Sequence, residues 1–136
     1  PSFDQYEYDT SSVTLVKFAD GALGKTAAIV DCFQPYYFHT HLVGSEGSLL
    51  DDQFTSMRLS KERNAWHRLS MKMCDSGDVS DHPYQSQFQE FFNALDRDEE
   101  MPLTSFSDAA RTFEVIFAAD QSASNGGQPV VPESFV

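Results

Sequence analysis

Hydrophobic and polar residues alternate along the first half of the chain, a pattern typical of β-strands. The alternation predicts strands at residues 12–19, 22–33, 36–43, 48–51, 54–59 and 65–73. Asp20 and Gly21 separate the first two strands and predict a two-residue type I′ turn, in which both central residues have positive φ. Because the other connections are also short, we expect an antiparallel meander.

After Cys74 the hydrophobic spacing changes to the three or four residues of an amphipathic helix. One stripe follows Pro83 and ends before Pro102; its members are Tyr84, Phe88, Phe91, Phe92 and Leu95. Ser105 and Asp108 form a capping-box pattern that predicts a second helix over 109–123, which the glycines at 126–127 end. Residues 128–132 are predicted as an edge strand. Strands followed by helices predict an α+β fold: a mostly antiparallel open β-sheet with two C-terminal helices packed on one face.

Both faces of the predicted sheet carry apolar side chains. In the first strand, Val13 and Leu15 point to the face opposite Val16 and Phe18. Two helices cover only one face, so we expect the other face to meet a second copy of the chain or another domain. The alternative is that small or scattered apolar residues on this face tolerate water.

Composition and charge narrow the classes of function. With 136 residues, the chain is expected to form one domain over 1–136 and is too short for an ordinary two-domain enzyme. Its net charge of −12 argues against binding to nucleic acid or to an anionic membrane surface. No apolar run reaches the ~20 residues of a membrane span, and Cys32 and Cys74 form no CxxC pair, which fits a reducing, cytoplasmic setting. Because the chain begins with Pro1 rather than Met, we expect it to be a piece of a longer protein.

The residues that bear chemistry form no complete active site. His39 and His41 with Glu46 match half of the cupin metal motif, but no second His-bearing motif completes a coordination shell. We therefore favour two histidines that line a sheet face, with a cupin-like metal enzyme as an alternative. Acidic pairs such as Asp51 and Asp52 occupy turns, where solvated charge is the ordinary interpretation. There is no G-x-G-x-x-G or P-loop motif in the sequence, so we predict no catalytic, cofactor-binding or metal residues in this chain.

Four motifs in a fixed order resemble the C-terminal domain of the Gfo/Idh/MocA oxidoreductases. They lie at residues 12–24, 43–49, 82–95 with Pro102, and 109–130. The resemblance implies a fragment of an NAD(P)-dependent enzyme that moves a hydride to or from a sugar, cyclitol or related polyol. It also implies that NAD or NADP, and the catalytic Lys of a Glu-Lys-Pro motif, belong to a separate N-terminal Rossmann domain that is absent from this chain. Without that domain the chain is expected to be inactive. The family's Asp-x3-His pair lies early in its second domain, and Asp78 and His82, which have that spacing, stand just before the helix, so no catalytic role is assigned to them.

The resemblance adds one substrate contact and one interface. Tyr84 matches an aromatic residue that faces the substrate in some family members, and a phenol can donate and accept hydrogen bonds with a polyol hydroxyl. The alternative is that Tyr84 is only the first residue of the core stripe. The family's sheet commonly forms the subunit contact, which implies a homo-oligomer through the open sheet face. The alternative function is a stand-alone protein-binding or assembly module that uses the same face.

Overall fold

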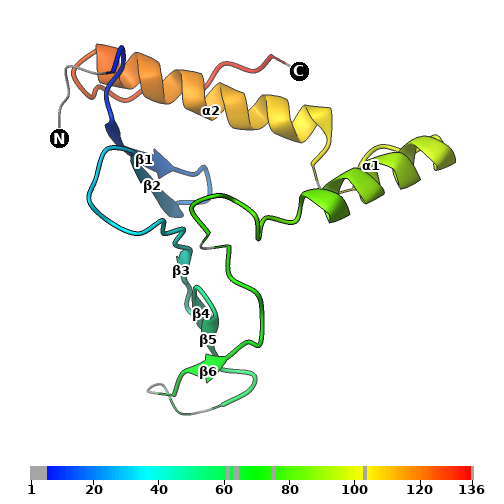
Figure 1. The fold of residues 1–136 in the computed structure, drawn as a ribbon. Helices are drawn as coiled ribbons and strands as arrows, with labels where there is room; N and C mark the ends of the chain where they lie inside the picture. Colours follow the sequence, from blue (N-terminus) through cyan, green and yellow to red (C-terminus); the bar gives the residue numbers. More distant parts are fainter. Residues whose placement is uncertain (1–5, 61, 63–64, 75, 103, 136) are drawn as a thin grey trace. The chain divides into compact units, whose positions relative to one another are not determined.

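The computed structural model describes residues 6–60, 62, 65–74, 76–102 and 104–135. Its elements, in chain order, are β1 (Ser11–Lys17), β2 (Leu23–Ile29), β3 (His41–Val43), β4 (Gly47–Leu50), β5 (Gln53–Ser56), β6 (His67–Arg68), α1 (Tyr84–Arg97) and α2 (Phe106–Ser124) (Figure 1). The chain divides into two compact units, residues 33–83 and the remainder on either side. That residues 1–136 form one domain of a longer protein stays a prediction.

The first unit contains an antiparallel hairpin of β1 and β2, in which Val13 pairs with Ala27. Its turn differs from the predicted type I′ turn. The Phe18 amide donates to the Ala22 carbonyl over 2.9 Å and the Gly21 amide donates to the Phe18 carbonyl over 3.0 Å, which closes a three-residue loop. Gly21 has φ +92°, whereas Asp20 is not among the residues with positive φ. The two-residue prediction is wrong because the loop is a turn followed by a glycine bulge, which needs only one residue with positive φ.

The second unit contains a four-stranded antiparallel meander in the order β3-β4-β5-β6. Its outer strands are shorter than the predicted 36–43 and 65–73, because a strand extends only as far as its neighbour offers a ladder. β4 and β5 have four residues each. Gly47 in β4 permits the close approach of β5, since a Cβ there would lie 2.6 Å from the carbonyl oxygen of Thr55.

The α+β prediction is confirmed: open antiparallel sheets precede two C-terminal helices. The single sheet expected from the sequence is divided into two, since no ladder in the described part of the chain joins the hairpin to the meander. Local alternation of residues identifies strands but does not determine which strands pair, so it could not reveal this division.

The signals for helix starts are confirmed, although α2 begins at Phe106, three residues before the predicted 109. Tyr84 is the first residue of α1, and Ser105 caps α2 with extended backbone angles of φ −64° and ψ 160°. The Ser105 hydroxyl accepts a hydrogen bond from the Asp108 amide over 3.1 Å, which satisfies one of the unpaired donors of the first turn. Gly126 and Gly127, with φ of 70° and 83°, turn the chain after α2 as predicted.

The C-terminal segment after α2 returns along that helix instead of forming the predicted edge strand at 128–132. The Ser122 hydroxyl donates to the Gln128 carbonyl over 2.7 Å, and the Phe135 amide donates to the Glu114 carboxylate over 2.7 Å. The ring of Phe135 meets that of Phe117 edge to face at 5.8 Å. The segment is thus held by side chains of α2 rather than by a strand ladder.

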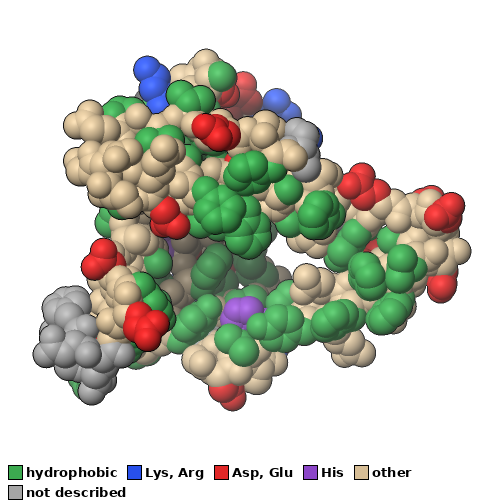
Figure 2. All heavy atoms as spheres, turned by 90° about the horizontal axis from the view of Figure 1, so that it is seen from above, with side chains coloured by type: hydrophobic (Ala, Val, Ile, Leu, Met, Phe, Trp, Pro, Cys, Tyr) green, Lys and Arg blue, Asp and Glu red, His purple; other side chains and the backbone are tan. Residues whose placement is uncertain are grey.

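Few hydrophobic side chains are enclosed. Ala94 is the only buried hydrophobic residue among those the structure describes, at 6% exposure. The apolar stripe of α1 is largely exposed, with Phe88 at 59% and Leu95 at 58%. Hydrophobic side chains accordingly occupy much of the visible surface (Figure 2). None of the helices in the described part of the chain combines the length and apolar character that crossing a membrane requires.

Candidate functional site

A cluster of residues joined by hydrogen bonds and ring contacts lies where β4 ends and the turn to β5 begins. We call it the Asp51 cluster; its members are Tyr37, His39, Thr40, His41 and Asp51. The Thr40 amide donates to Asp51 Oδ1 over 2.8 Å, and the Asp51 amide donates to the Thr40 carbonyl over 2.9 Å. Asp51 has φ +52°, a left-handed conformation that Asp tolerates better than most residues. These reciprocal bonds fix the carboxylate relative to the segment that precedes β3.

The Asp51 carboxylate orients the imidazole of His39. Nδ1 of His39 lies 3.0 Å from Asp51 Oδ2 and 2.8 Å from the Tyr37 hydroxyl, and the rings of His39 and Tyr37 stack with 18° between their planes. A carboxylate only accepts hydrogen bonds, so Nδ1 carries a proton; in the neutral form of the ring Nε2 is then left as an acceptor. The arrangement is a carboxylate–imidazole pair with a fixed tautomer.

Hydrogen bonds keep the Asp51 carboxylate ionised. Its pKa is lowered from the usual value, first by the Thr40 amide and then, against a partial opposing effect of burial, by His39 and Tyr37. The side chain of Asp51 is 20% exposed and that of His39 is 40% exposed. The negatively charged Asp51 is therefore the more buried partner, while part of the His39 imidazole is exposed to solvent.

The predicted half of a metal motif does not converge. The ring of His41 lies 6.1 Å from that of His39, but Glu46 forms an exposed ion pair with Arg58 over 3.4 Å. Within the residues that the structure describes, no group of three or more His, Cys, Asp or Glu side chains is placed to hold a metal ion. His41 is the first residue of β3 and His39 precedes the strand, so the two histidines do not both lie on a sheet face as expected.

Asp51 is the site residue that the sequence interpretation missed. It was grouped with Asp52 as solvated turn charge, yet it holds His39, while Asp52 pairs with Arg68 over 3.2 Å. The pairing register of β3 with β4 brings Asp51 to this site: His41 pairs with Leu50, so the residues next to that pair, Thr40 and Asp51, also lie opposite each other. Register was not available from alternation alone.

Tyr84, the predicted substrate contact, opens α1 and is 49% exposed. It belongs to the first unit, whereas the Asp51 cluster belongs to the second. A partly exposed phenol at the start of a helix is accessible to a ligand hydroxyl, and its role as a substrate contact stays a prediction.

The loop before α1 forms a second polar network. Asp78 accepts hydrogen bonds from the hydroxyl of Ser76 and the amide of Ser80, and these bonds lower the pKa of Asp78 to about 2. Val79 between them has φ +56°, which is unfavourable for a β-branched residue. The network holds the loop in a conformation that the isolated chain would avoid.

His82 in this loop is paired with its neighbour rather than with Asp78. Its Nδ1 lies 3.2 Å from Oδ1 of Asp81, and these two side chains are only 23% and 9% exposed. The ring of Tyr36 lies 6.2 Å from that of His82. In the described part of the chain Asp78 bonds to Ser76 and Ser80, while His82 lies against Asp81 and Tyr36.

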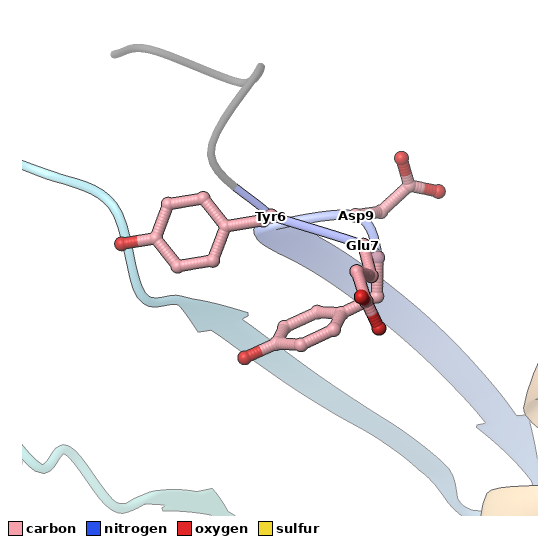
Figure 3. Close-up of a pocket in the computed structure, with 4 residues that line it drawn as sticks. Tyr6, Glu7 and Asp9 are labelled. Atoms are coloured by element: carbon pink, nitrogen blue, oxygen red, sulfur yellow. The ribbon is translucent and has the colours of Figure 1, made fainter.

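A shallow hollow of about 320 Å³ lies before β1 and is lined by Tyr6, Glu7, Tyr8 and Asp9. The two tyrosine rings meet edge to face at 6.0 Å, and the carboxylate of Asp9 points away from the ring of Tyr6 (Figure 3). The lining comes from consecutive residues of one segment, and no other described residue lines the hollow. The Asp51 cluster is the better candidate site.

Comparison of the chain with family models, with curated proteins and with solved structures gave no match.

Proposed function

We propose that this chain is the C-terminal domain of an NAD(P)-dependent oxidoreductase that acts on a sugar, cyclitol or related polyol in the cytoplasm. The observation that carries the proposal is the ordered resemblance to the Gfo/Idh/MocA oxidoreductases, whose motifs coincide with element boundaries. Residues 12–24 include the β1–β2 turn, 43–49 the β3–β4 turn, and 82–95 the start of α1. The last motif, 109–130, covers most of α2 and its glycine termination.

The amount of exposed surface supports an incomplete assembly. The chain exposes 11940 Å², whereas two separate compact globules with the lengths of the two units would expose about 8,500 Å² in total. The exposed surface includes the apolar stripe of α1. Surfaces of this kind are typical of contacts with another domain or subunit.

The chain itself does not fit a nicotinamide dinucleotide. Such a cofactor binds where a glycine-rich turn leads from a strand into a helix N-terminus. In the described part of the chain, α1 follows the loop at 76–83 and α2 follows the cap at Ser105, and neither begins directly after a strand. NAD or NADP is therefore assigned to an N-terminal Rossmann domain, and the present chain supplies a substrate-side wall, including Tyr84, and an oligomer interface.

The first experiment reads the gene upstream of Pro1 and expresses the longer protein. We expect a strand–G-x-G-x-x-G–helix segment and a Glu-Lys-Pro motif, and NAD(P) reduction on addition of cyclitols or sugars. The 136-residue chain alone serves as the control and should be inactive. A stop codon or an unrelated domain immediately upstream would contradict the proposal.

A variant of the longer protein tests the assigned role of Tyr84. Tyr84→Phe removes one hydroxyl and is expected to raise KM for the polyol about 10-fold, as expected for the loss of one ligand hydrogen bond. Tyr8→Phe, at another exposed tyrosine, is the matched control and should leave KM unchanged. Equal KM values for the two variants would leave Tyr84 as part of the apolar stripe only.

The exposed hairpin supports a second candidate, a stand-alone binding or assembly module. Val13, Leu15 and Leu23 are each at least 70% exposed on β1 and β2. Sedimentation of the isolated chain tests whether this surface pairs with a second copy, in which case both proposals predict self-association. A strict monomer at high concentration contradicts self-pairing, and a partner interface without nicotinamide dependence favours the module.

A further inference from the structure

The imidazole of His39 is held with one nitrogen engaged and the other available. Nδ1 is taken by Asp51 and Tyr37, and among the described residues no hydrogen bond reaches Nε2. We propose that Nε2 of His39 accepts a hydrogen bond from a hydroxyl of a polyol ligand, which makes the Asp51 cluster a hydroxyl-recognition subsite. The choice of a polyol rests on the proposed function.

The surroundings of His39 favour a neutral, hydroxylated ligand. Tyr37 is 60% exposed, and its ring, which stacks on that of His39, offers aromatic surface next to a single fixed polar acceptor. Ligand sites typically combine apolar and aromatic side chains with a few oriented polar groups. A hydroxyl donor satisfies Nε2, while the C–H groups of a sugar or cyclitol ring can pack on the aromatic surface.

Other ligand classes fit less well. An anion would approach the ionised carboxylates of Asp51 and Asp52 in a chain of net charge −12, which repels it. A metal ion finds two imidazoles but no third ligand group in the described part of the chain. A neutral hydroxyl needs no further charge, and it uses the tautomer that Asp51 fixes.

Asp51→Asn changes the tautomer with little change of shape. The amide nitrogen of an Asn at this position can donate to Nδ1, which moves the ring proton to Nε2 and converts the proposed acceptor into a donor. Asn also tolerates the left-handed φ of residue 51. Asp52→Asn is the matched control, because it removes the neighbouring carboxylate, which pairs with Arg68 and not with His39.

The experiment is a nitrogen-15 NMR titration of the histidine rings in the 136-residue chain, with myo-inositol as the probe and dioxane, a ring ether without hydroxyls, as the control. We expect Nδ1–H in the free protein and a saturable shift of His39 Nε2 with myo-inositol, with a Kd on the order of millimolar for so small a ligand. Dioxane should cause no saturable shift. Asp51→Asn should weaken the myo-inositol effect at least 10-fold, and Asp52→Asn should preserve it.

Three results would overturn the subsite: an Nε2–H tautomer in the free protein, no saturable shift with myo-inositol, or equal behaviour of the two Asn variants. If the amide fingerprint spectrum shows that Asp51→Asn does not fold, His39→Gln, which leaves the carboxylate in place, is tested instead. In this variant the backbone amides of Thr40 and Asp51 must lose the saturable myo-inositol shifts that they show in the unaltered chain, and shifts that persist would overturn the subsite. Failure of the subsite is distinct from failure of the proposed function. Polyol-dependent NAD(P) reduction by the longer protein without a His39 response would contradict the subsite alone. A His39 response to myo-inositol without NAD(P) reduction by the longer protein would contradict the oxidoreductase proposal alone.

Discussion

Gly47→Ala tests the close approach of β4 and β5 at the first residue of β4, where Gly47 pairs with Ser56. A Cβ at Gly47 would lie 2.6 Å from the backbone oxygen of Thr55, well inside the 3.4 Å at which ordinary contact begins. A carbonyl oxygen cannot rotate away as a side chain can, so the two strands must separate. Separation strains the nearby bonds in which the Met57 amide donates to the Glu46 carbonyl over 2.8 Å and the Gly44 amide donates to the Gly47 carbonyl over 2.9 Å.

The magnitude follows from two opposing effects. Overpacking of this kind typically costs about 1–3 kcal/mol, and the reduced freedom of Ala in the unfolded chain returns about 0.4–1 kcal/mol. We therefore expect the free energy of unfolding to fall by about 1–2 kcal/mol. With a urea dependence of about 1 kcal/mol per molar for so small a unit, the unfolding midpoint of the meander shifts down by about 1–2 M.

The assay is urea unfolding followed through amide resonances of β4 and β5, so that the meander is measured separately from the helices. Gly24→Ala in β2, followed in the same way through amide resonances of β1 and β2, is the matched control, since its Cβ comes closest to the exposed ring of Phe18, at 3.2 Å, and its nearest contacts are side-chain rather than backbone atoms. A ring at the surface can move, and the midpoint should change little. If Gly47→Ala is as stable as Gly24→Ala, the two strands do not approach as closely as described and the reasoning fails.

Three further predictions concern single side chains. Ser105→Ala should lower the free energy of unfolding by about 1 kcal/mol because the α2 cap is lost, whereas Ser105→Asp keeps an acceptor and should retain the stability. Urea unfolding monitored by circular dichroism at 222 nm measures the difference, and equal stability of the unaltered chain and both variants would refute the role of the cap. The pKa of Asp78, about 2, lies below its unfolded value, so this carboxylate stabilises the fold above pH 4 and its contribution is lost as the pH falls toward 2. Carboxyl carbon-13 titration of Asp78 measures that pKa directly, and a midpoint near 4 would contradict the hydrogen-bond network. Arg58→Gln should change stability by less than about 0.5 kcal/mol, because the ion pair with Glu46 is mostly exposed, and a larger loss would reveal an additional contact.

Local signals predicted the helices well because each signal is contained in a few neighbouring residues. The cap at Ser105 and the glycines after α2 act within one turn of the chain, and the structure places both as expected. The stripe that begins at Tyr84 also identified α1 to its first residue. The lengths of the strands were less predictable, because a strand extends only as far as its partner. β3 begins at His41, which pairs with the last residue of β4, Leu50, and not at residue 36, where its own alternation begins.

The Asp51 cluster could not be found from local pattern because its members come from two sides of a hairpin. His39 and Asp51 are twelve residues apart, and only the register of β3 with β4 brings them together. The prediction of a two-residue turn after Phe18 was wrong for a related reason. Gly21 was recognised as the residue with positive φ, but the number of loop residues depends on which amide closes the ladder.

Asp51 combines two demands that no other residue type meets equally well, which connects the backbone of the turn to the proposed subsite. The turn requires φ of +52°, for which Gly has the least steric cost, and His39 requires a carboxylate acceptor. Gly would relieve the backbone but release the imidazole, and Glu would keep the charge but fit the left-handed conformation poorly and extend the carboxylate beyond the Thr40 amide. Local strain that is retained only because surrounding hydrogen bonds compensate for it is typical of functional positions. Asp51→Gly should therefore fold at least as well as Asp51→Asn yet leave the His39 tautomer unfixed, and a His39 ring that keeps its proton on Nδ1 in that variant would show that Asp51 is not what orients it.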